Sequence, residues 1–230
     1  MIRIKGLSHT YRIGKRGRII EVPVLHEIDL HVARKEIVAV TGRSGSGKST
    51  LLNLISGFIR PSAGEIEIDG CPVTRFSEGE WADFRLQKIG FIFQNYQLIP
   101  GMTVYENVEL PMVLRKVEPK QRRRLAEEML ERVGLAEFAA FYGDELSGGM
   151  QQRVSVARSL VLRPPLILAD EPTGSLDSEN ERALLDFILQ LNRELQVTFL
   201  IVTHDRRVAS IAGRRIHLQD GRLVGEGAAV

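Results

Sequence analysis

Gly42-Arg43-Ser44-Gly45-Ser46-Gly47-Lys48-Ser49, followed by Thr50, matches the pattern G-x-x-x-x-G-K-[ST]. Glycines allow backbone N–H groups to curl around phosphate oxygens, because no Cβ stands in the way. In this pattern the lysine neutralises the β- and γ-phosphates, and the hydroxyl of Ser49 is placed for Mg²⁺. The stretch from Gly42 to Thr50 therefore predicts a site for the phosphates of a nucleotide.

The flanking residues agree with such a site. Residues 36–41 (EIVAVT) form the short apolar run of a buried strand, and residues 51–55 (LLNLI) continue as a helix. A helix that begins near Lys48 directs its N-terminal dipole at the same anion. A dinucleotide fingerprint is the rival interpretation, and it fails because Thr50 stands where its third glycine should be.

Alternating apolar and polar residues up to about residue 40 predict an antiparallel sheet with one solvated face. The basic run at 14–18 is expected to be the turn between two of its strands. Further strands are predicted at 65–69, 89–93, 166–169 and 197–202, and a hairpin at 215–224 around Asp220-Gly221. Buried strands separated by helices indicate a parallel sheet with right-handed crossovers.

Residues 103–163 are expected to be mainly helical and to form a subdomain that projects from the sheet. Thr103 and Glu106 have the spacing of a capping box, and Pro111 should kink or end the helix that they begin. Pro119 opens the next helix and Gly134 stops it. The helix at 179–195 carries an apolar stripe on one face.

Composition excludes several classes of function. The formal net charge of +2 leaves no polycationic surface for nucleic acid. The single cysteine, Cys71, cannot form an internal disulfide and fits a reducing compartment. No run approaches the roughly 20 apolar residues that cross a bilayer. We therefore expect a soluble, cytoplasmic chain, for which any membrane-spanning part is supplied by a partner.

Two acids follow an apolar strand at residues 166–171 (LILADE). Adjacent carboxylates at a buried strand end are costly unless a cation compensates them, and the Mg²⁺ of a nucleotide would do so. Asp170 would serve the metal, and Glu171 would act as general base on the attacking water. His204 ends another buried strand, where parallel strands present ligand-binding residues, and is expected to contact the γ-phosphate. His9, His26, His31 and His217 lack that context and are interpreted as structural.

The run Leu146-Ser147-Gly148-Gly149-Met150-Gln151-Gln152-Arg153 is a Ser-Gly-Gly turn that opens a helix, and so a second anion-binding helix start. The chain already has a phosphate loop at 42–49. A second such site makes sense if it serves the nucleotide of another subunit.

That run resembles the signature motif of the ABC ATPase family, in which two subunits enclose two ATP molecules head to tail. Tyr11 resembles the aromatic residue that stacks on adenine. Gln94 resembles the glutamine that senses Mg²⁺ and the permease. Residues 175–177 (SLD) resemble the D-loop, in which Asp177 is expected to contact nucleotide, and His204 resembles the switch histidine. The resemblance covers essentially the whole chain in the family's order.

The chain departs from the family pattern at two places. Met150 replaces a residue that is often polar, and the stretch between Tyr11 and Leu25 is longer than usual. The second departure bears on the adenine contact. Within the family, residues 93–100 and 167–177 resemble the lipoprotein-release, macrolide-export and FtsE-like ATPases, which transmit force to permeases with large extracytoplasmic domains.

The resemblance implies an α/β fold of the P-loop NTPase kind, with a mixed sheet, an N-terminal antiparallel subdomain and an inserted helical subdomain. The expected organisation is one ATPase domain over residues 1–230, with the helical subdomain at about 95–163. The expected function is ATP hydrolysis with Mg²⁺, in a dimer of this chain that drives a membrane permease from the cytoplasmic side. Its cargo would be lipophilic, a lipoprotein or a peptide. Lys48, Gln94, Glu171 and His204 are the expected catalytic residues, and Ser49, Gln94 and Asp170 the expected metal ligands.

Three alternatives remain. One is a signalling ATPase of the FtsE kind that controls an extracytoplasmic activity without transport. Another is an ABC ATPase that acts on nucleic acid or ribosomes, although the chain has neither a coiled-coil insertion nor a second ATPase half. The third is a degenerate subunit that binds nucleotide for assembly alone, which the complete set of acids and His204 argues against.

Overall fold

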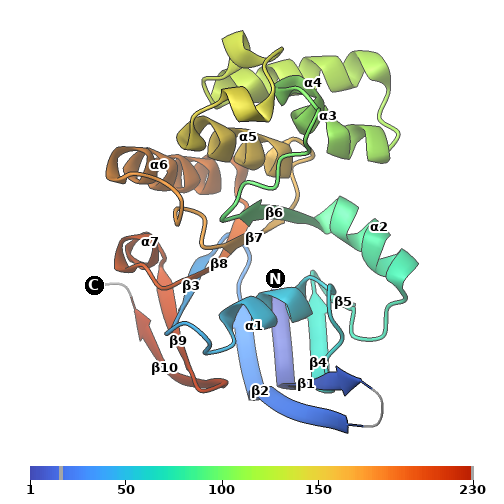
Figure 1. The fold of residues 1–230 in the computed structure, drawn as a ribbon, viewed down its shortest axis with the longest axis vertical. Helices are drawn as coiled ribbons and strands as arrows, with labels where there is room; N and C mark the ends of the chain where they lie inside the picture. The colour runs from blue at the N-terminus through green and yellow to red at the C-terminus, as the bar shows by residue number, and fades with distance from the viewer. Residues whose placement is uncertain (16–17, 229–230) are drawn as a thin grey trace. The chain divides into compact units, whose positions relative to one another are not determined.

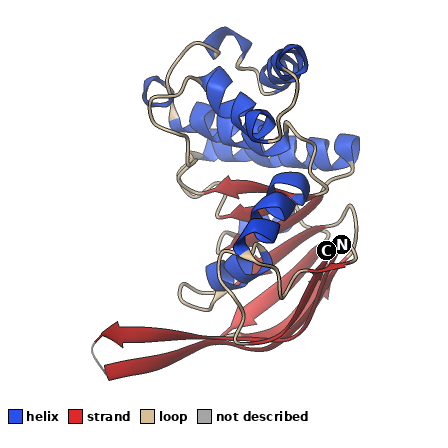
Figure 2. Ribbon diagram, turned by 90° about the vertical axis from the view of Figure 1, so that its right-hand side faces the viewer, coloured by secondary structure: helices blue, strands red, loops and turns tan. Residues whose placement is uncertain are grey.

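The computed structural model describes residues 1–15 and 18–228 (Figures 1 and 2). The chain divides into two compact units. The first unit combines residues 1–82 with the chain from residue 198 onward, and the second unit consists of residues 83–197. The first unit is thus built from both ends of the sequence. Among the helices so described, none is both long enough and apolar enough to span a bilayer.

An antiparallel sheet opens the first unit, in the strand order β2-β1-β4-β5. Its strands are β1 (Ile2–Lys15), β2 (Arg18–Val32), β4 (Ala63–Ile68) and β5 (Cys71–Pro72). Alternate residues of β1 and β2, such as Ile2, Ile4, Ile28 and Leu30, are buried, as the period-two pattern predicts. Of the predicted basic turn at 14–18, residues 14 and 15 end β1 and Arg18 begins β2, while residues 16 and 17 lie outside the described residues.

A second set of strands in this unit follows the order β10-β9-β3-β8 (Figure 1). These are β3 (Ile37–Thr41), β8 (Thr198–Thr203), β9 (Arg214–Gln219) and β10 (Arg222–Ala228). Strand β3 lies parallel to both β8 and β9, whereas β9 and β10 form an antiparallel hairpin. The expected mixed sheet is confirmed. Helices α1 (Lys48–Ile55) and α7 (Arg206–Ser210) follow β3 and β8 along the chain.

The second unit contains a parallel pair of strands and most of the helices. No strand lies between β6 and β7 along the chain, which confirms the helical block. The elements are β6 (Ile89–Phe93), α3 (Val104–Leu114), α4 (Pro119–Arg132), η1 (Ala136–Phe138), η2 (Gly143–Glu145), α5 (Gly148–Leu160), β7 (Leu166–Asp170) and α6 (Ser178–Leu195).

The predicted helix ends in this block have the expected chemistry, with one difference. Thr103 and Glu106 form the capping box, with Glu106 N donating to Thr103 Oγ1 at 3.2 Å and Thr103 N donating to Glu106 Oε2 at 2.7 Å. Helix α3 does not end at Pro111 but continues to Leu114. Pro111 lies so near the C-terminus that only one further turn follows its missing N–H, which limits the cost.

Helix α2 (Glu78–Lys88) has no counterpart among the sequence predictions. The sequence nevertheless carries a signal for it. Ser77 and Glu80 have the capping-box spacing, and Glu80 N lies 3.3 Å from Ser77 Oγ while Ser77 N lies 2.8 Å from Glu80 Oε2. The low apolar content of α2, in which Trp81 is the buried residue, explains why its periodicity was too weak to detect.

Candidate nucleotide site

The phosphate loop of the first unit connects the C-terminal end of β3 to the N-terminus of α1. Gly47 occupies the N-cap of α1 with φ 103°, in the left-handed region that side chains rarely adopt. A Cβ on Gly47 would also lie 2.7 Å from Leu25 Cδ2 on β2. The second glycine of the G-x-x-x-x-G-K motif is thus required for its backbone angle and for its close approach to β2.

The side chain of Lys48 points back into the phosphate loop that precedes it in the sequence. Its Nζ donates to the carbonyl oxygens of Gly42 at 2.9 Å and Arg43 at 3.1 Å, and the residue is 8% exposed. The loop therefore wraps around an ammonium group. Ser46 is equally enclosed, and its Oγ has no hydrogen-bond partner in the described part of the chain. A buried hydroxyl donor beside a buried cation suits an anion.

A turn from the far end of the sequence supports this loop. Gly221, between β9 and β10, donates its N–H to Ser46 O at 3.3 Å. The carbonyl of Gly221 in turn accepts from His26 N on β2 at 2.8 Å. The predicted hairpin around Asp220-Gly221 thus holds the phosphate loop against β2. Sequence reasoning found this hairpin but gave it no role, because nothing local to it indicates what it contacts.

His204 emerges at the same edge as the phosphate loop. Thr41, the last residue of β3, pairs in parallel register with Thr203, the last residue of β8. Gly42 and His204 follow these two residues directly, so both segments leave the sheet side by side. His204 is exposed. The next residue, Asp205, caps α7 by accepting from Arg207 N at 2.7 Å.

Tyr11 lies on β1 beside the N-terminal turn of α1. Its hydroxyl is 3.4 Å from Thr50 Oγ1, and its ring meets the His9 ring edge-on, with centroids 4.6 Å apart. Burial lowers the pKa of His9. In strand register Tyr11 is directly opposite Val22 of β2, so the two side chains share a face. An aromatic surface with an aliphatic neighbour therefore lies next to the phosphate loop.

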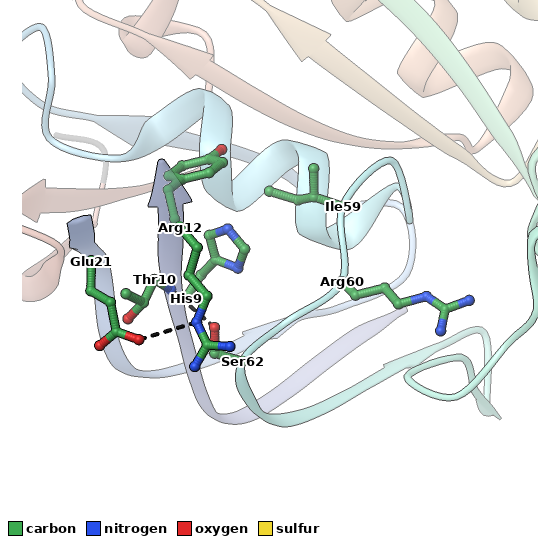
Figure 3. Close-up of a pocket in the computed structure, with 8 residues that line it drawn as sticks. His9, Thr10, Arg12, Glu21, Ile59, Arg60 and Ser62 are labelled. Carbon is green, nitrogen blue, oxygen red and sulfur yellow. Dashed lines mark hydrogen bonds and ion pairs between the residues drawn. The ribbon is translucent and has the colours of Figure 1, made fainter. Parts of the chain in front are cut away.

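A hollow of about 590 Å³ adjoins Tyr11 (Figure 3). Arg12 and Glu21 form an ion pair across β1 and β2 at its rim, with Arg12 Nε 3.1 Å from Glu21 Oε1. The hollow is thus polar at its rim and aromatic at Tyr11, as a site for a heterocyclic base requires. Its lining residues are His9, Thr10, Tyr11, Arg12, Glu21, Ile59, Arg60 and Ser62.

In the second unit a parallel pair of strands places another set of predicted site residues at one edge of the sheet. Phe93, which ends β6, pairs with Asp170, which ends β7. Gln94 and Glu171 follow at the same edge and are exposed and half-buried respectively. Glu171 has φ 45°, a left-handed conformation that costs on the order of 1 kcal/mol for a residue with a side chain. Strain of this kind is typical of a functional position.

The Ser-Gly-Gly turn opens α5 as predicted. Ser147 is the N-cap, and its Oγ accepts from Met150 N at 3.4 Å. Gly148 and Gly149 form the first turn, where N–H groups have no partner within the helix. No acidic residue lies in that turn. The start of α5 therefore presents an uncompensated helix dipole, which favours an anion.

Asp177 caps α6 and is held by the residue three positions later. Its Oδ1 accepts from Asn180 N at 2.8 Å, and both of its carboxylate oxygens accept from Asn180 Nδ2, at 3.0 and 2.9 Å. These hydrogen bonds lower the pKa of Asp177 below its ordinary value. A carboxylate used in this way is a structural element of its loop, in addition to any role toward a ligand.

Several residues that sequence reasoning missed hold the second unit's loops together. Gln152, fully buried on α5, donates to Pro172 O in the loop after β7 at 2.6 Å. Arg158 and Asn107 bind the segment after Gln94. Gln152 lies in the quoted signature run. Its role could not be predicted, because its partner is distant in sequence and is a backbone atom that any residue would provide.

Mg²⁺ prefers oxygen ligands, and the predicted metal ligands Ser49, Gln94 and Asp170 offer a hydroxyl, an amide and a carboxylate. Ser49 belongs to the first unit. In the second unit Gln94 follows β6, and Asp170 is the last residue of the adjacent strand β7. Within the described chain no group of three or more His, Cys, Asp or Glu residues could hold a metal on its own. The Ser49 hydroxyl in the first unit, and the Gln94 amide and Asp170 carboxylate in the second, each fit an ion that is also bound by nucleotide phosphates.

Comparisons with known proteins agree with this geometry. A family model described as ABC transporter matches residues 25–174. The "ABC transporter ATP-binding protein YtrE" of Bacillus subtilis (strain 168) is 58% identical over 225 residues, which are 98% of this chain and 97% of that protein. The cassette MJ0796, described as a bacterial ABC transporter cassette with a dimeric structure, is 40% identical with a TM-score of 0.90. That comparison covers 100% of this chain and 99% of the cassette.

A second structure of MJ0796, a dimer in a post-hydrolysis state bound to ADP and Pi, is 39% identical over the same shares of the two chains and also has a TM-score of 0.90. The chain therefore belongs to the ABC transporter family. Its fold is the mixed α/β fold of ABC ATPase cassettes, and it is an ATP-binding subunit with ATPase activity.

Proposed function

We propose that two copies of this chain bind two ATP molecules and use their hydrolysis to drive a membrane permease. The observation that supports this most directly is the presence of two separate anion-binding helix starts, at α1 and at α5, in one chain. In this proposal, residues 42–50 of one copy and Ser147, Gly148 and Gly149 of the other enclose each triphosphate. MJ0796 is described as a dimer, in one structure with bound ADP and Pi, and this supports the dimer of this chain in the proposal.

Binding is assigned mainly to the first unit. Lys48 and the N–H groups of residues 42–49 would hold the β- and γ-phosphates, with the Ser46 hydroxyl as an additional donor. The adenine ring would stack on Tyr11, where Val22 adds apolar surface on the same strand face. Ser49, Gln94 and Asp170 would hold Mg²⁺, which neutralises charge on the phosphates when bound.

Hydrolysis is assigned to Glu171, which follows β7, and His204, which follows β8. Glu171 would accept a proton from the attacking water, whose oxygen forms the new bond to the γ-phosphorus as the bond to the β-γ bridging oxygen breaks. The leaving ADP keeps the electron pair of that bond. His204 would contact the γ-phosphate, and Asp177 of the second copy would approach the same nucleotide. Loss of the γ-phosphate removes the group that joins the copies, so the dimer opens.

The permease is proposed to contact the segment that follows Gln94. Ile99 in this segment is 41% exposed, and Tyr96, Leu98 and Met102 are half-buried, so several neighbouring apolar side chains are available to a protein partner. We propose a working position at the cytoplasmic face of the membrane and one ATPase domain over residues 1–230 with a helical subdomain at about 95–163. The proposed permease is of the force-transmitting kind, with a lipophilic, lipoprotein or peptide cargo, on the resemblance of residues 93–100 and 167–177 alone.

Glu171→Gln tests the general base. The amide keeps the size and polarity of the side chain but does not accept the proton, so turnover should fall by about 10²–10⁴-fold. ATP binding should persist, and size-exclusion chromatography with ATP should show a stable dimer. Glu179→Gln, on the exposed first turn of α6, is the matched control and should hydrolyse ATP like the parent chain. Normal turnover by Glu171→Gln would exclude this assignment.

A further inference from the structure

Two loops of the second unit exchange a reciprocal pair of hydrogen bonds. The Ser175 hydroxyl donates to the carbonyl of Gln94 at 3.2 Å. The Tyr96 hydroxyl donates to the carbonyl of Ser175 at 3.3 Å. Each loop therefore supplies one side-chain donor and one backbone acceptor to the other, so a displacement of either loop breaks both bonds or carries the other loop with it.

The same Tyr96 hydroxyl lies against the start of α5. A Cβ placed on Gly148 would be 2.6 Å from Tyr96 Oη, which is closer than real Cβ contacts. The next ring atom, Cζ, would be 3.6 Å away, an ordinary van der Waals distance. One oxygen atom thus touches the loop of Ser175 and the turn of Ser147-Gly148-Gly149, and it belongs to the segment after Gln94.

The backbone at Tyr96 and Gln97 is strained and is held in place by a side chain of α5. Tyr96 and Gln97 have φ values of 57° and 53°, both left-handed. Arg158 on α5 donates to both of their carbonyl oxygens, at 3.0 Å to Tyr96 O and 2.6 Å to Gln97 O. Two consecutive left-handed residues persist only where the surroundings impose them. The forked guanidinium of Arg158 supplies that constraint.

Arg158 is itself held by a buried amide. Asn107 is fully buried, its Oδ1 lies 3.4 Å from Arg158 Nη1, and the same oxygen accepts from Ile99 N at 2.8 Å. Burial lowers the pKa of Arg158. Across residues 1–15 and 18–228 no carboxylate lies within ion-pair distance of it, so its donors serve the loop carbonyls and Asn107.

We propose that Tyr96, held by Arg158, is a positioning residue that makes the Gln94 segment, the Ser175 loop and the start of α5 move as one body. This inference rests on the proposed function, in which Gln94 faces the permease, Ser147-Gly148-Gly149 and Asp177 face the second copy, and Glu171 performs the chemistry. It adds the part that links these sites. A shift imposed on Gln94 reaches the surface of α5 without passing through the first unit.

A double-mutant cycle tests the contact without any need for ATP turnover. Gly148→Ala should lower the midpoint of thermal unfolding by about 2–4 °C, because the new Cβ displaces Tyr96 Oη and breaks its hydrogen bond to Ser175 O. Tyr96→Phe removes that oxygen, so adding it to Gly148→Ala should restore at least half of the loss. Strictly additive effects of the two substitutions would overturn the proposed contact.

The functional part is tested by the kinetics of the full-length chain. Tyr96→Phe should lower kcat by about 5-fold, the loss expected for one positioning hydrogen bond, and leave KM for ATP within about 2-fold. Arg158→Lys, which keeps the charge and loses the fork, should show the same split. Tyr142→Phe and Arg123→Lys, at exposed positions of the same unit, are controls and should change neither constant.

The outcomes separate this proposal from the function on which it rests. If Glu171→Gln abolishes turnover while Tyr96→Phe and Arg158→Lys keep parental kcat, the positioning role is wrong and the ATPase assignment stands. If Glu171→Gln turns over normally, the assignment of the base fails, and the double-mutant cycle still reports on the contact between Tyr96 and Gly148. If Tyr96→Phe and Arg158→Lys lower thermal stability along with kcat and also raise KM for ATP, these residues have a merely structural role and the positioning role is wrong.

Discussion

The two units present their functional residues by different means. In the first unit the phosphate loop is shaped by backbone: Gly47 is left-handed, and Lys48 is enclosed by the carbonyls of Gly42 and Arg43. In the second unit the loops after β6 and β7 are shaped by side chains that hydrogen-bond to distant backbone atoms. Tyr96, Gln152 and Arg158 are the main ones.

This difference suits the two tasks. A loop that binds phosphate must keep its N–H groups aimed at one point, and a loop fixed by its backbone angles and by backbone hydrogen bonds such as that from Gly221 does so without distant side chains. Loops that respond to a partner must instead move together although they are distant in sequence. Side-chain hydrogen bonds of about 1 kcal/mol each, such as those of Tyr96 and Arg158, join such loops to one another.

Lys48→Met should give the largest effect and tests the first unit's chemistry. The substitution keeps an unbranched side chain that is only one atom shorter and removes the cation, so turnover should fall by at least about 100-fold, with weaker ATP binding. Isothermal titration with ATP and a phosphate-release assay would measure both losses. Lys5→Met, at an exposed position of the same unit, is the control. ATP affinity equal to that of the parent chain would contradict the role of Lys48.

Gly47→Ala and Gly45→Ala test whether the loop is built by backbone. At Gly47 the new Cβ meets Leu25 at 2.7 Å in addition to the unfavourable φ, and about 2–4 kcal/mol of stability should be lost. At Gly45, with φ 81° and open space around the Cβ, the loss should be about 1 kcal/mol. Urea unfolding without nucleotide measures the difference. Equal losses would show that the contact with β2 contributes nothing.

Gln152→Met and Gln151→Met form a matched pair for the second unit. Both glutamines donate to a carbonyl, Gln152 to Pro172 O and Gln151 to Leu146 O at 3.1 Å, but only Gln152 is fully buried. Gln152→Met leaves a buried carbonyl unsatisfied and should cost about 1–3 kcal/mol, against less than about 1 kcal/mol for Gln151→Met. Urea midpoints compare the two. A larger loss for Gln151→Met would reverse the proposed importance of burial.

The contrast between the units also explains what the sequence could predict. The phosphate loop, the strand before it and the helix after it were all predicted, because a backbone-built loop needs glycines and a lysine at fixed spacing. The capping boxes and the hairpin at Asp220-Gly221 are local in the same way. Helix α2 was missed because its only strong signal, Ser77 with Glu80, lies at its start.

Long-range ties could not be predicted. Nothing in the sequence around Arg158 indicates that its partners lie some sixty residues earlier. They are the carbonyl oxygens of Tyr96 and Gln97, two residues with left-handed backbone. A carbonyl oxygen is present at every residue, so such a hydrogen bond leaves no pattern of residue types at its acceptor end. The fold class can be predicted from periodic segments of the sequence, whereas the hydrogen bonds between the loops are visible only in the folded structure.

The first unit's division between the two ends of the chain has a consequence for synthesis. Strand β3 pairs with β8 and β9, which are translated only after the whole second unit. The second unit is contiguous and can begin to fold on the ribosome, while β3 and α1 wait for their neighbours. The apolar surface of β3 thus stays without its neighbouring strands until the end of synthesis, and the phosphate loop is completed last.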